Sequence, residues 1–134
     1  MNNRFWMAFA AVYVSFHLLG FLLHGVMLAD TYKALAAVWR PEAEMQAKMW
    51  VMFANSAVYL FLFCYIFTRG YENKGIMEGL RYGGLMGLFV SIMTAYDSYV
   101  IYPVPYSLVL TWFVSGVVIY VVLGAVLASI YKRA

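Results

Sequence analysis

The sequence predicts an all-α integral membrane protein, a bundle of four membrane-spanning helices. Hydrophobic residues make up 66% of the 134-residue chain and charged residues only 11%, which is outside the usual composition of soluble domains. Four apolar stretches, separated by polar breaks, each reach the roughly 20 residues that a helix needs to cross a hydrocarbon core of about 30 Å. These stretches are continuous rather than alternating, so helices are expected instead of a transmembrane barrel.

The first helix is expected over residues 5–29, followed by a polar connector. Its apolar run is too long for the core of a signal peptide and lacks a small-residue cleavage site, so we expect it to be retained. In the connector, residues 31–39 could form a short helix on the membrane surface with Trp39 at the level of the lipid headgroups.

The second helix is expected over residues 42–68. Pro41 suits the first turn, where its missing N–H costs nothing. Glu42 and Glu44 favour the positive end of the helix dipole. These features place the helix start in the polar connector, before the apolar run begins.

The third and fourth helices are expected over residues 76–101 and 106–131. Pro103 and Pro105 break the chain between them. No polar segment is long enough for a separate soluble domain, so residues 1–134 are predicted to form a single transmembrane domain.

The basic residues predict the orientation of the bundle, because positive charges concentrate in cytoplasmic loops. Six would share the side of the two termini, against three on the opposite side: Arg4, Arg69, Lys74, Arg81, Lys132 and Arg133 against Lys33, Arg40 and Lys48. Both termini are therefore expected in the cytoplasm. The net charge of +3 is spread over the loops without a basic run, so binding to nucleic acid is not expected.

A shift of the chain by half its length, 67 residues, places Asp30 on Asp97 and Tyr32 on Tyr99. In each half of the chain, this Asp-x-Tyr segment ends one predicted helix and is followed by proline and the next predicted helix. The bundle could thus consist of two similar helical hairpins in tandem. So few identities also arise by chance, and the sequence leaves both alternatives open.

The third predicted helix carries small residues at steps of four, which place them on one face. They are Gly79, Gly83, Gly87, Ser91 and Ala95. Such a ridge lets the backbone of another helix approach closely. We therefore expect these five residues to form a helix-packing surface, either within the chain or against a partner, and Gly116, Gly124 and Ala128 offer a weaker matching surface.

His17 and His24 are seven residues apart within the first helix, so they would lie close to one helix face. Histidines inside a membrane are candidates for function, although many are neutral and hydrogen-bonded to a neighbour. Haem ligation needs histidines on facing helices, and zinc or copper needs more ligands than two. We therefore predict no metal and no cofactor, and the sequence leaves a haem or quinone redox subunit open as a third alternative.

Counted inward from the outer boundary, polar residues of all four helices fall at a similar depth. They are His24, Asn55, Ser56, Thr94, Asp97 and Thr111. They could line an outward-opening pocket for a polar headgroup, a quinone ring or a cation, with His24 and Asp97 facing each other. A hydrogen-bond network between the helices, with no ligand, explains the same residues.

Catalytic motifs are absent from the sequence, which contains no HExxH, GxSxG or phosphate-binding loop and no paired carboxylates within the apolar runs. We therefore do not expect an enzyme. A small protein with packing faces and no soluble domain is expected to be an accessory or structural subunit of a larger membrane complex. The alternative is a small oligomeric transporter, channel or lipophilic-ligand-binding protein that uses the polar cluster.

Three segments carry a resemblance to a known group: HGVMLADTYKALAAVWRPEAEMQAKMW, GLRYGGLMGL and YPVPYSLVLTWFVSG. Together they resemble small bacterial four-span inner-membrane proteins of unknown function. The resemblance covers most of the chain and implies a bacterial inner-membrane location and four helices. It implies no activity. Membrane lipids and either other subunits or further copies of this chain are the expected partners.

Overall fold

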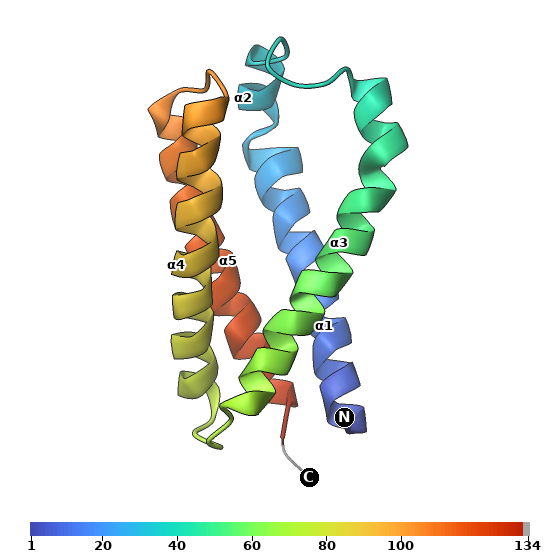
Figure 1. Ribbon diagram of the computed structural model, residues 1–134, viewed down its shortest axis with the longest axis vertical. Coiled ribbons are helices and arrows are strands. Elements are labelled where there is room, and N and C mark those ends of the chain that lie inside the picture. Colours follow the sequence, from blue (N-terminus) through green and yellow to red (C-terminus); the bar gives the residue numbers. More distant parts are fainter. Residues whose placement is uncertain (133–134) are drawn as a thin grey trace.

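The computed structural model describes residues 1–132 and confirms the all-helical membrane bundle (Figure 1). Four of its helical spans are long and apolar enough to cross a membrane. Arg133, which entered the charge prediction, lies outside the described residues. The elements in chain order are α1 (Asn3–Gly20), η1 (Phe21–Met27), α2 (Ala29–Ala34), α3 (Glu42–Arg69), α4 (Ile76–Ile101) and α5 (Tyr106–Ile130).

The start of α1 and the end of α5 lie at the same end of the bundle, together with the α3–α4 connection (Figure 1). The Asn2 side-chain amide donates to the Lys132 carbonyl at 3.2 Å. The segment around α2 and the α4–α5 connection lie at the opposite end. We call these the terminal end and the α2 end. In place of the surface helix expected over residues 31–39, the structure has the shorter helix α2. Turns follow α2 as far as residue 39.

The closest helix contact joins α4 to α5. The buried residues of α4 are the five small ones, Gly79, Gly83, Gly87, Ser91 and Ala95. A Cβ atom added to Gly79 would lie 2.1 Å from the Gly124 carbonyl oxygen, and one added to Gly83 would lie 2.2 Å from that of Tyr120. The absence of side chains at these positions therefore allows the two backbones to touch.

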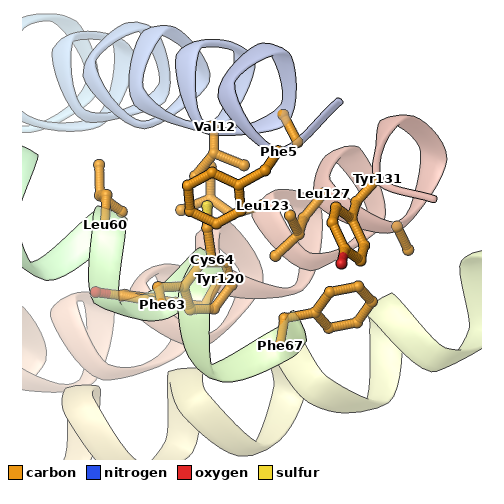
Figure 2. Packing of buried hydrophobic residues seen from close by; sticks show 12 residues of the cluster. Phe5, Val12, Leu60, Phe63, Cys64, Phe67, Tyr120, Leu123, Leu127 and Tyr131 are labelled. Atoms are coloured by element: carbon orange, nitrogen blue, oxygen red, sulfur yellow. The ribbon is translucent and has the colours of Figure 1, made fainter. Parts of the chain in front are cut away.

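A hydrophobic core at the terminal end joins the other helices to this pair (Figure 2). Phe63 of α3 packs edge-on against Tyr120 of α5, with ring centroids 5.5 Å apart. The Tyr82 hydroxyl of α4 donates to the Phe63 carbonyl. Phe5 of α1 completes the core from the other side. All four long helices are thus held together at this end.

Towards the α2 end, α3 leans away from α4 and α5 (Figure 1). It keeps contact with α1, since the Tyr13 hydroxyl donates to the Phe53 carbonyl at 3.1 Å. No residue of α3 from Glu42 to Asn55 is buried. The α1–α3 and α4–α5 hairpins therefore differ in packing, whatever their similarity in sequence.

Candidate functional site: a cavity within the membrane spans

The divergence of α3 leaves a cavity of about 1010 Å³ that faces all the main helices. Binding sites for small molecules commonly have volumes of about 300–1,000 Å³. Most of its lining is apolar, including Phe16 of α1, Leu62 of α3, Met86 and Val90 of α4 and Ile119 of α5. On α4 the lining extends from Met86 to Ser98, about 18 Å along the helix axis. The cavity therefore has the length and character to hold a hydrocarbon chain.

One wall contains a π-helical turn, η1, which carries His24. The Leu28 N–H donates to the Leu23 carbonyl, five residues back, at 2.9 Å. Isolated π-helical turns often occur at functional sites. This turn begins between His17 and His24 and changes the angle between them, so the α-helical register expected for the two histidines does not hold.

His24 belongs to a chain of hydrogen bonds at the α2 end of the cavity. The Trp112 Nε1–H of α5 donates to the Tyr32 hydroxyl at 2.8 Å, and this hydroxyl lies 2.5 Å from His24 Nδ1. Because the hydroxyl already accepts from Trp112 and has one proton to give, we assign Tyr32 as the donor to His24 Nδ1. This assignment from the network leaves the His24 proton on Nε2.

Burial and hydrogen bonding together set the pKa of the Tyr32 hydroxyl. Burial raises the pKa of Tyr32 above its ordinary value of 10.0, and the hydrogen bond from Trp112 opposes part of that rise. Tyr32 therefore remains a neutral phenol at physiological pH, which is the form that donates to His24.

Trp39 adds a second tryptophan to this end of the cavity. Its ring lies edge-on to Tyr32, with centroids 5.8 Å apart, and 6.4 Å from Trp112. Its Nε1 is buried and has no hydrogen-bond partner among residues 1–132. A buried N–H without an acceptor is unusual and costly, of the order of 1–3 kcal/mol. This orphan donor therefore indicates a missing acceptor.

None of the described residues that line the cavity is an acid, a lysine or an arginine. Two hydroxyl groups of the lining donate their protons within α4, Thr94 to the Val90 carbonyl and Ser98 to the Thr94 carbonyl. Asn55 lines the cavity from α3. The lining therefore offers hydrogen bonds but no formal charge.

The structure places some of the predicted cluster at this cavity and the rest elsewhere. His24, Asn55 and Thr94 line it, whereas Asp97 and Thr111 are not among the lining residues. The expected contact between His24 and Asp97 does not form: within residues 1–132 neither an ion pair nor a hydrogen bond joins them, since Asp97 is exposed and His24 is paired to Tyr32.

His17 has a separate partner. Its Nε2 lies 2.9 Å from the Ser56 Oγ, which donates its own proton to the Phe53 carbonyl at 2.9 Å. His17 must therefore be the donor to Ser56. This pair joins α1 to α3, and neither residue is among those lining the cavity.

Sequence reasoning did not group Tyr32, Trp39 and Trp112 with His24. Trp39 and Tyr32 were expected on an outer connector, and Trp112 was not singled out. Residue spacing carries no signal for this group, because Trp112 and Tyr32 are 80 residues apart in the chain.

A smaller cavity, about 340 Å³, lies at the α3–α4 connection and has charged lining residues. Its carboxylates are already paired. The Glu78 carboxylate accepts from the backbone N–H groups of Glu72 and Lys74, at 2.6 and 2.8 Å. The hydrogen bond from Lys74, and then its positive charge, lower the pKa of the Glu72 carboxyl. We interpret this cavity as part of a stabilised turn.

The fold and cavity together define a multi-pass helical membrane protein. In residues 1–132, no three histidine, cysteine or acidic side chains are grouped so that they could hold a metal ion. The chain matches no protein-family model, no curated protein sequence and no solved structure. Its function has therefore to be argued from the cavity itself.

Proposed function

We propose that this protein binds a lipophilic molecule in the cavity between its membrane spans. The observation that carries the proposal is the pairing of an apolar cavity of about 1010 Å³ with the unpartnered Trp39 Nε1 at one end. Apolar walls with a few convergent polar groups are typical of ligand sites. The walls would take the hydrocarbon part, and the polar end would fix its orientation.

Photolabelling in reconstituted bilayers tests this proposal. The probe is a long-chain fatty alcohol with a diazirine on its chain. Met86 and Val90 line the cavity. Leu85 and Phe89 lie on the same turns of α4, are each 70% exposed and are not among the lining residues. Both pairs should be labelled, but excess unlabelled alcohol should suppress only the labelling of Met86 and Val90, because only a site saturates.

The opposite result would remove the proposal. If Met86 and Val90 remain unlabelled, or if the competitor affects both pairs equally, the cavity holds no saturable lipophile. The comparison is internal to one protein sample, so it does not depend on how much protein is folded.

A second candidate is an accessory subunit of a larger membrane complex. The supporting observation is the first half of α3, from Glu42 to Asn55, which has no buried residue. A partner helix could cover this segment. Non-enzymatic roles of both kinds agree with the absence of catalytic motifs from the sequence.

Cross-linking in native membranes tests the accessory role. A photoreactive phenylalanine analogue in place of Trp50, which is exposed on α3, should cross-link to one defined larger protein. The same analogue in place of Val100, exposed on α4, serves as the control. Cross-links to lipid alone from both positions would count against this role.

We also propose a bacterial inner-membrane location with cytoplasmic termini. The resemblance of the sequence to small bacterial membrane proteins supports the location. The excess of positive charge at the terminal end supports the orientation. A carboxyl-terminal fluorescent protein that matures only in the cytoplasm should therefore fluoresce, and a dark fusion at normal expression would reverse the assignment.

A further inference from the structure

We propose that the ligand has a neutral polar head with a carbonyl oxygen, which accepts hydrogen bonds from His24 Nε2 and Trp39 Nε1. This inference rests on the proposed function, because it assigns the head of the lipophile that the cavity is proposed to hold. The specific claim is that the site recognises an acceptor, rather than a donor or a charge.

The unpaired groups at the α2 end of the cavity are donors. The Tyr32 hydroxyl accepts from Trp112 and donates to His24 Nδ1, so its one proton is already used. Within the group of His24, Tyr32, Trp39 and Trp112, the protons that remain unpaired are those on His24 Nε2 and Trp39 Nε1. A carbonyl oxygen has two lone pairs and no proton, which matches two donors.

The two donors belong to rings that both contact Tyr32. The His24 and Trp39 rings both lie against the Tyr32 ring, with centroids 5.8 Å away in each case. The histidine ring is stacked on Tyr32, whereas the Trp39 ring meets it edge-on. The Trp39 nitrogen is buried, so a ligand oxygen would reach it only after the indole rotates.

The charge of the lining selects a neutral head. An anionic head would have neither lysine nor arginine beside it, and a cationic head no carboxylate, since the described lining residues include none of these. Placing an unpaired ion in such surroundings is costly. A head that only donates protons would leave both N–H groups without acceptors.

The position of the donors sets the direction of the chain. Trp39 follows α2 in the chain, and the lining continues along α4 from Ser98 to Val90 and Met86, where it is apolar. A bound molecule would place its head near the α2 end and its tail towards the middle of the bundle. Two membrane sources supply this chemistry, the ring carbonyl of a quinone and the ester carbonyl of a neutral glycerolipid.

Direct binding measurements can separate these sources. The full chain is reconstituted in nanodiscs of ether-linked phosphatidylcholine, which has no ester carbonyl, and ligand binding is measured by native mass spectrometry. The probes are a decyl-substituted benzoquinone and a monoacylglycerol, with decylbenzene and dodecyltrimethylammonium for comparison. At least one carbonyl probe should bind about tenfold more tightly than decylbenzene.

Matched variants test the two donors. Trp39→Phe keeps an aromatic ring but removes the N–H, and should reduce the affinity for the carbonyl probe several-fold more than the affinity for decylbenzene. Trp50→Phe, on the exposed side of α3, should change neither. His24→Gln, which keeps an N–H donor, should retain more affinity than His24→Leu.

The outcomes separate this inference from the proposed function. If the quinone or the monoacylglycerol binds more tightly than decylbenzene, the inference is supported, and the tighter of the two identifies the source of the carbonyl. If decylbenzene or the ammonium probe binds as tightly as both carbonyl probes, or if Trp39→Phe has no effect, the carbonyl assignment is overturned while the lipophile site stands. If no probe binds, the proposed function fails and the inference fails with it.

Discussion

Replacing Gly83 by alanine should force α4 and α5 apart and destabilise the bundle. The new Cβ atom would lie 2.2 Å from the Tyr120 carbonyl oxygen, 0.8 Å short of the 3.0 Å that real Cβ atoms essentially never cross. The clash is with backbone, which cannot rotate away. Overpacking of this kind costs about 1–3 kcal/mol, and the better helix propensity of alanine returns about 1 kcal/mol. We expect a net loss of up to about 2 kcal/mol relative to the wild type.

Gly84→Ala is the matched control at the neighbouring position. A Cβ atom there meets only Val121 Cγ2, at 3.8 Å, which is an ordinary contact. The control should be neutral or more stable by about 0.5–1 kcal/mol. Unfolding by sodium dodecyl sulfate, followed by circular dichroism, measures both. Equal stability of the two variants would refute the close approach of the helices at Gly83.

Three further predictions concern the hydrogen bonds. Tyr32→Phe leaves both partners of the hydroxyl unpaired and should lower the free energy of unfolding by about 1–3 kcal/mol. Tyr99→Phe is the control, because the Tyr99 hydroxyl makes no hydrogen bond within residues 1–132, and it should leave the stability unchanged. Similar values for the two variants would contradict the hydrogen-bond network. Burial raises the pKa of Tyr32, so its contribution to stability should be complete below pH 10 and disappear as the pH rises through the folded-state pKa. A Tyr32→Phe variant should therefore lose less stability over this pH range than the wild type. A difference titration at 295 nm between the two proteins that gives Tyr32 an ordinary pKa would exclude this effect. Ser56→Ala removes the acceptor of His17 and should lower the free energy of unfolding in sodium dodecyl sulfate by about 1 kcal/mol. Binding of the carbonyl probe should be unchanged, because Ser56 is not among the residues that line the cavity. Weaker probe binding would show that the His17–Ser56 pair and the cavity are coupled.

The number and type of the long helices followed from composition because crossing a membrane is a property of each segment. A run of apolar residues can satisfy its backbone only as a helix, whatever its neighbours do. The small residues of α4 were similarly readable from spacing. Steps of four define one face, and glycine at that spacing is useful only where another backbone comes close.

The relation between the histidines was not readable in the same way. Seven-residue spacing predicts a shared face only if the helix stays α-helical, and η1 interrupts it from Phe21. His17 consequently bonds Ser56 on α3 while His24 bonds Tyr32. Nothing in the spacing revealed that turn, although Gly20 before it and Gly25 within it permit departures from α-helical geometry.

The sequence by itself determined an all-helical membrane protein with four long spans and a glycine-lined packing face, because helix formation in lipid and the faces of a helix are local properties. Only the tertiary structure decided that α3 leans away from α4 and α5 and leaves a cavity. It also decided that His24, Tyr32, Trp39 and Trp112 meet there, since contacts between distant segments depend on how helices pack rather than on the spacing of residues along the chain.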